Sequence, residues 1–122
     1  MKYEPLWERF EAILPDGTRC RVQFLRAGFL TLGDRPELYF FRVTCAADAA
    51  ESASEEVAVG LSGNALKRFE TARRSLSREE KIDLAGLLLK ENIEAGKALD
   101  SNNLFIWDDE LAALAGELGL PR

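Results

Sequence analysis

The residues of this chain best suited to chemistry are its carboxylates, because the sequence contains no histidine. Histidine is the side chain whose ordinary pKa lies nearest neutrality, and it is the commonest metal ligand. Its absence excludes Ser-His-Asp and Cys-His nucleophiles, and every zinc or iron site that depends on imidazole. Aspartate and glutamate are then the abundant candidates for general acid–base work. A carboxylate-dependent metal enzyme is therefore the enzymatic alternative that the composition keeps open.

Three consecutive carboxylates, Asp108, Asp109 and Glu110, form the densest acidic cluster of the sequence. Such a cluster could bind Mg²⁺ or another hard cation through its oxygens. Acids are equally common in the first turn of a helix, where they stabilise the positive end of the helix dipole. The apolar pattern after residue 110 predicts a helix start at this point, so the structural role is favoured. We predict no catalytic residue, no metal ligand and no cofactor.

A second candidate for chemistry is a local excess of cations between residues 67 and 78. Its members are Lys67, Arg68, Arg73, Arg74 and Arg78. Together with Arg19 and Arg21, which alternate on the exposed side of a predicted strand, this patch could follow a phosphate backbone. The formal net charge of the chain is −5, however, and an acidic protein repels nucleic acid at long range. A solvated helix surface is preferred, and nucleic-acid binding is the alternative.

The two cysteines, Cys20 and Cys45, are too few for a disulfide scaffold and lack the spacing of metal ligands. Neither has an activating base in the pattern, so each is interpreted as a small buried hydrophobic residue. We predict a cytoplasmic protein with reduced thiols. No run of consecutive apolar residues, the leucine triplet at residues 87–89 included, approaches the ~20 residues of a membrane span, so no membrane partner is predicted.

The first half of the chain has the period-two pattern of strands with one buried face. A turn at residues 15–17, with the sequence Pro-Asp-Gly, separates two such segments and predicts a hairpin. Further strands are predicted at residues 29–32, 38–45 and 57–61, with a short edge strand at 104–107. The segment 38–45 carries apolar residues on both faces, which is typical of a central strand. Residues 46–56 hold no large apolar side chain and are predicted to form a mobile loop, although the alanines would also permit a short exposed helix.

Helix signals dominate the second half. Ser62 is a plausible N-cap, and Ser77 with Glu80 fits a capping box at the start of a helix that Gly96 ends. A last helix follows residues 108–110. Residues 60–64 lie between a strand and a helix, where phosphates often bind, but they lack the lysine and glycine spacing of known phosphate loops. The chain is predicted to be a single α+β domain, with an antiparallel sheet of about four to six strands and the C-terminal helices on one face.

The helix at residues 77–95 has an apolar arc wider than one neighbour requires. It is either the organising helix of the fold or a helix that also meets a second subunit. Its candidate interface residues are Ile82, Leu84, Leu88, Leu89 and Ile93. On this basis the leading hypothesis is a small, non-catalytic binding or regulatory module that acts through protein–protein contact, with an unidentified partner and with self-association as a homodimer. Nucleic-acid binding through residues 67–78 comes second, and the metal enzyme third.

Overall fold

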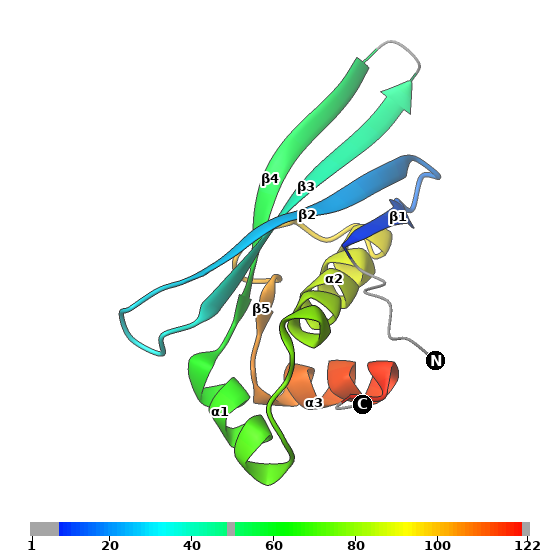
Figure 1. Ribbon diagram of the computed structural model, residues 1–122. Coiled ribbons are helices and arrows are strands. Elements are labelled where there is room, and N and C mark those ends of the chain that lie inside the picture. Colours follow the sequence, from blue (N-terminus) through cyan, green and yellow to red (C-terminus); the bar gives the residue numbers. More distant parts are fainter. Residues whose placement is uncertain (1–7, 49–50, 121–122) are drawn as a thin grey trace.

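The computed structural model describes residues 8–48 and 51–120. In chain order these residues form β1 (Arg9–Ile13), β2 (Arg19–Phe29), β3 (Glu37–Asp48), β4 (Glu51–Leu61), α1 (Gly63–Ala72), α2 (Arg78–Glu94), β5 (Phe105–Ile106) and α3 (Asp108–Leu118). The strands make one sheet in the order β1-β2-β3-β4-β5, and every pairing is antiparallel except that of β5 with β4. In Figure 1 the described helices lie on one side of the sheet, and the upper β3–β4 hairpin extends beyond them. The α+β prediction is confirmed, with β3 central and β5 at the edge.

Two local signals in the N-terminal half act as the sequence predicts. In the β1–β2 turn, the carboxylate of Asp16 accepts a hydrogen bond of 2.8 Å from the backbone N–H of Thr18, and Gly17 has a φ of +90°. β2 then continues past its predicted end, because a bulge between Phe24 and Arg26 lets it stay paired with β3. The strand predicted separately at residues 29–32 is therefore the end of β2 and the start of its turn.

The mobile loop predicted at residues 46–56 is wrong for the part that the structure describes. β3 continues to Asp48 and β4 begins at Glu51, so this segment is the end of a long hairpin. Residues 49–50 lie outside the described residues. The prediction relied on the absence of large apolar side chains, but an antiparallel ladder depends on backbone hydrogen bonds, which small residues make equally well.

The apolar arc of α2 belongs to the core. The five residues predicted as an interface are all buried in the chain: Ile82, Leu84, Leu88, Leu89 and Ile93. The arc is wide because α2 contacts β1 and β4 of the sheet and also α3. These side chains are closed to a second copy, which corrects the interface prediction.

The two cysteines form a disulfide. Cys20 of β2 and Cys45 of β3 are direct cross-strand partners, and their sulfurs are bonded. The prediction of reduced thiols is therefore wrong, although Cys20 is fully buried as expected. The pairing could not be read from the spacing of the two residues, because it follows from the register of β2 against β3.

Candidate binding surface

The sheet has one face that the helices cover and one face without them. On β3, Phe41 and Val43 are buried beneath the helices, whereas Arg42 between them is exposed on the opposite side. The neighbouring strand β2 follows the same alternation, with Val22 buried and Arg21 exposed. We call the side that no described helix covers the outer face.

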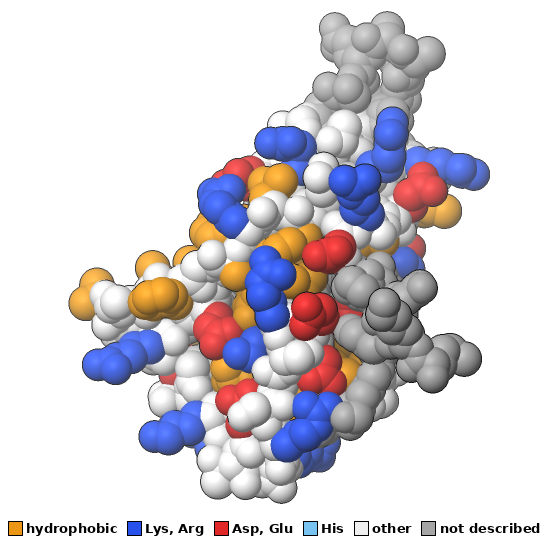
Figure 2. Space-filling model, in the orientation of Figure 1, with side chains coloured by type: hydrophobic (Ala, Val, Ile, Leu, Met, Phe, Trp, Pro, Cys, Tyr) orange, Lys and Arg blue, Asp and Glu red, His pale blue; other side chains and the backbone are white. Residues whose placement is uncertain are grey.

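The upper half of the outer face carries a cluster of arginines. Cross-strand pairing aligns Arg9 of β1 with Gln23 of β2, and Gln23 with Arg42 of β3. Arg21 lies two residue pairs further along β2, and Arg19 two pairs beyond that, so both are on the same face as Gln23. We call Arg9, Arg19, Arg21 and Arg42 the arginine cluster. In Figure 2, Lys and Arg side chains gather over these upper strands.

The arginine cluster surrounds a hollow of about 1130 Å³. Gln23 and Thr44 line the same hollow, together with one carboxylate, that of Glu11. Within residues 8–48 and 51–120, the four guanidinium groups form no ion pair and no hydrogen bond with another side chain. All four side chains are exposed. The hollow is thus rich in hydrogen-bond donors with positive charge.

A different arginine, Arg26, forms the lower border of the cluster and is neutralised. Its guanidinium donates hydrogen bonds of 3.1 and 2.7 Å to the two carboxylate oxygens of Glu56. The hydrogen bond raises the pKa of Arg26 and lowers the pKa of Glu56. The same guanidinium lies over the ring of Phe40, 4.4 Å from its centroid. Arg26 therefore marks a change from basic to aromatic surface.

The lower end of the outer face, beside β5, is aromatic. The ring of Phe105 covers Gly60 of β4 so closely that a Cβ atom there would come within 2.5 Å of it. Trp107 packs on Phe105, with ring centroids 4.4 Å apart. Because Trp107 is 54% exposed, much of its indole remains open to solvent. We call Phe105 and Trp107 the aromatic end.

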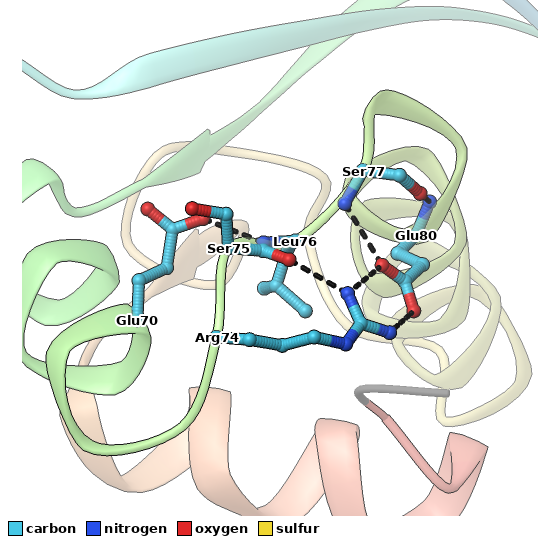
Figure 3. Close-up of polar contacts among 6 residues, drawn as sticks. All are labelled: Glu70, Arg74, Ser75, Leu76, Ser77 and Glu80. Carbon is cyan, nitrogen blue, oxygen red and sulfur yellow. Dashed lines mark hydrogen bonds and ion pairs between the residues drawn. The ribbon is translucent and has the colours of Figure 1, made fainter.

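The cations predicted as a patch at residues 67–78 have partners inside the chain. Arg74 donates two hydrogen bonds, of 3.2 and 3.0 Å, to the buried carboxylate of Glu80 and one of 2.7 Å to the carbonyl of Ser75 (Figure 3). Glu80 also accepts from the backbone N–H of Ser77, whose hydroxyl in turn accepts from the backbone of Glu80. This is the predicted capping box, and Arg74 is part of it.

The other members of that predicted patch are also engaged, except one. Arg68 forms a bidentate ion pair with Asp108 at the start of α3. Arg73 and Arg78 each lie over a phenylalanine ring, 4.7 and 5.4 Å from its centroid. Lys67 is exposed. The segment therefore offers much less free positive charge than the arginine cluster, and its binding of a phosphate backbone stays a prediction.

The predicted acidic cluster lies where the sequence places it, in the first turn of α3. Asp108, Asp109 and Glu110 are all exposed there. Trp107 is the N-cap residue, and its side chain makes no capping hydrogen bond. Among the described residues, no group of three or more Cys, Asp or Glu side chains is arranged to hold a metal ion.

Residues 60–64, the segment between strand and helix where phosphates often bind, are in contact with a carboxylate of the chain itself, that of Asp34. Asp34, from the β2–β3 turn, accepts a hydrogen bond of 2.8 Å from the backbone N–H of Asn64. The hydroxyl of Ser62 and the first backbone N–H groups of α1 hold the pKa of Asp34 below its ordinary value. A Cβ atom on Gly63 would meet the carbonyl of Asp34 at 2.2 Å. This helix start therefore anchors the turn.

A second hollow, of about 620 Å³, lies beside this anchor. Its carboxylates also have partners: Glu37 accepts from the hydroxyl of Tyr39 and from Lys81, and Glu70 accepts from the backbone N–H of Leu76. Burial and the neighbouring Glu37 raise the pKa of Tyr39. These contacts connect β3, α1 and α2, so the charged groups here stabilise the fold.

The tip of the β2–β3 hairpin exposes large apolar side chains. Phe29 is 71% exposed, Leu30 50% and Leu32 82%. In Figure 1 this tip projects from the body of the protein, and in Figure 2 hydrophobic side chains gather on it. Exposed apolar residues that are contiguous, rather than scattered, mark interaction sites.

Comparison with protein-family models, curated proteins and solved structures finds no match to this chain. Within the described part of the chain, no helix combines the length and the apolar character needed to cross a membrane.

Proposed function

We propose that this protein is a non-catalytic binding module that holds a polyanion on the outer face of its sheet. The observation that carries the proposal is the arginine cluster: four exposed guanidinium groups around one hollow, without ion pairs among the described residues. Like charges placed side by side repel one another, and a bound anion removes that repulsion. The planar guanidinium also matches the oxygens of phosphate with two parallel hydrogen bonds.

The distribution of charge over the molecule supports this proposal. The chain as a whole has a formal charge of −5, so the outer face is basic on an otherwise acidic protein. The net negative charge of the rest of the molecule orients an approaching polyanion toward the outer face, because long-range repulsion disfavours the other approaches. The net charge of the chain disfavours nucleic-acid binding, but it is a sum over the whole surface. It therefore does not describe a protein whose positive and negative charges lie on different faces.

The experiment is a calorimetric titration with inorganic polyphosphate, which carries phosphate charge and no base. Replacing Arg21 and Arg42 together by glutamine removes two of the four cations and leaves a polar side chain at each position. We expect the affinity to fall at least about tenfold, because each charge-assisted hydrogen bond contributes more than a kcal/mol. The matched control removes two cations from the predicted helical patch, Lys67→Gln with Arg73→Gln.

We expect that control to retain nearly the wild-type affinity. A larger loss in the control than in the outer-face variant would move the site to the helical patch. No measurable binding of polyphosphate by the wild type at low salt would overturn the proposed function.

A second candidate is self-association, and the hairpin tip is the observation that favours it. Two tips packed across a two-fold axis would bury Phe29, Leu30 and Leu32 of each copy. The apolar residues of α2 cannot form such an interface, because they are already buried in the core. The test is sedimentation equilibrium at micromolar concentration, with Leu32→Ser as the variant. Dimers in the wild type that dissociate in the variant support this candidate, and a monomeric wild type overturns it.

A further inference from the structure

We infer that the polyanion is single-stranded nucleic acid, with its phosphates on the arginine cluster and its unpaired bases on the aromatic end. The inference rests on the proposed function and adds the chemistry of the lower outer face. Nonspecific binders of single strands combine a basic groove that follows the backbone with aromatic rings on which bases stack. Both features lie on one uncovered face of this sheet.

The two features are aligned along the strands. On β3, Arg42 of the cluster is followed toward the hairpin tip by Phe40 and Leu38, and Leu38 pairs with Gly60, the residue that Phe105 covers. Four residues of strand cover about 13 Å, a length that a few nucleotides can follow. A single strand of nucleic acid that lies along β3 therefore reaches the aromatic end while its phosphates remain among the arginines.

The aromatic end is built to receive a planar ligand. Phe105 is held by its contact with Gly60, which a side chain at that position would prevent. Trp107 packs on Phe105 with the ring planes tilted by 41°, and its exposed indole extends the aromatic surface outward. A ring that is supported on one side and open on the other is a platform for a base. Carboxylates of an acidic protein would match the arginines but would leave this platform unused.

The same geometry favours a single strand over a duplex. In a duplex the bases are stacked on one another and cannot lie on a side chain. A helix or a two-stranded ribbon that enters the major groove is the usual means of reading duplex DNA, whereas this surface is the broad face of a sheet. Recognition by stacking is tolerant of sequence because every base has a π-face. We expect preference for strandedness and little preference for sequence.

Fluorescence of Trp107 reports directly on the stacked base. The chain has two tryptophans, and the Trp7→Phe variant makes Trp107 the only one. This variant of the full chain is titrated with a thymidine oligonucleotide of about 12 nucleotides, within the range that single-strand binding domains cover. The comparison ligands are a duplex of equal length, an abasic sugar–phosphate chain of equal length, and polyglutamate.

We expect the oligonucleotide to quench Trp107 and to bind about tenfold more tightly than the abasic chain, which lacks bases to stack. Replacing Trp107 by alanine should remove that advantage and leave binding of the abasic chain unchanged. Trp107→Phe, which keeps an aromatic ring, should restore most of it. The logarithm of the binding constant should fall with the logarithm of salt concentration, with a slope of about −0.7 for each phosphate neutralised.

The outcomes separate the inference from the proposed function. Equal affinity for the oligonucleotide and the abasic chain, without a change in Trp107 fluorescence, overturns the inference and leaves polyanion binding in place. Polyglutamate binding as tightly as the oligonucleotide overturns the inference in favour of an acidic protein partner. No binding of any of these polyanions overturns both.

Discussion

The carboxyl group of Glu91, on α2, is affected by the carboxyl group of Glu117, on the neighbouring helix α3. Burial raises the pKa of Glu91, and the hydrogen bond and negative charge of Glu117 raise it further. Lys90 and Lys97 act in the opposite direction, with smaller effects. At neutral pH the two carboxylates therefore oppose the packing of α2 on α3.

This pair predicts a pH dependence. Because the pKa of Glu91 in the folded chain is above its ordinary value of 4.5, the folded chain retains a proton that the unfolded chain has already lost. The free energy of unfolding contributed by this group is highest below the ordinary pKa and falls as pH rises through the raised value. Replacing Glu117 by glutamine should raise stability at neutral pH by a few tenths of a kcal/mol, or roughly 1–2 °C, since solvent screens an exposed pair.

Thermal unfolding at several pH values measures this effect. The difference between Glu117→Gln and the wild type should shrink as the pH falls below the ordinary glutamate pKa, which serves as an internal control. An unchanged or lower melting temperature of the variant at neutral pH would show that the pair does not destabilise the fold.

Single residues were predictable where the signal is local. The turn at Asp16 and Gly17 formed as expected, and Arg19 and Arg21 were correctly placed on an exposed strand face. Arg42 was not recognised as their neighbour, because its distance in sequence hides a cross-strand relation. Alternation of Arg42 with buried residues of β3 was the available signal. The register of β1, β2 and β3 is needed to show that Arg42 lies beside the arginines of the other two strands.

At the scale of elements, the start of α2 is the most strongly specified feature. Ser77 and Glu80 satisfy each other's backbone N–H groups, and Arg74 adds its two hydrogen bonds to the same carboxylate (Figure 3). We predict that Ser77→Ala lowers the free energy of unfolding by about 1 kcal/mol, the usual loss for an N-cap hydroxyl. Urea denaturation measures it. Ser75→Ala is the matched control, because the Ser75 contact to Arg74 is made by its backbone carbonyl.

That control should change stability by no more than about 0.5 kcal/mol, as exposed substitutions usually do. Equal losses in the two variants would mean that the capping box is not what fixes the start of α2.

Helices were easier to predict than the strands that accompany them. The caps at Ser62, Ser77 and Gly96 are local in sequence, and each lies where it was expected. β4 begins at Glu51, in a segment of alanine, serine and glutamate whose pattern has no strand period. It is a strand because β3 pairs with it over its whole length. The sequence predicts the wide apolar arc of α2, but it does not show that the arc is covered by the sheet and α3 together.

At the scale of the whole molecule, the disulfide links the two strands that carry most of the outer face. It joins Cys20 and Cys45 across a sequence separation of 25. Closing a loop of about this length stabilises a fold by roughly 2–4 kcal/mol, chiefly by restricting the unfolded chain. We predict that dithiothreitol lowers the urea midpoint correspondingly. The double variant Cys20→Ala with Cys45→Ala should have a lowered midpoint that dithiothreitol does not change.

An unchanged urea midpoint of the wild type in dithiothreitol, with reduction confirmed by thiol titration, would contradict a stabilising disulfide. Retained polyanion binding after reduction is the expected accompanying result, because the backbone ladder of β2 and β3 extends from the cysteine pair to Phe29 and Glu37 without the disulfide.

Both proposals require that the charges of this acidic protein are separated, so that one uncovered sheet face is basic. The most direct test is an NMR titration of the isotopically labelled full chain with the thymidine oligonucleotide. We expect amide shifts to change on the outer-face strands, around Arg21, Gln23 and Arg42, and at Trp107. Shift changes centred on residues 67–78, or spread over the helices while β2 and β3 stay unperturbed, would contradict it.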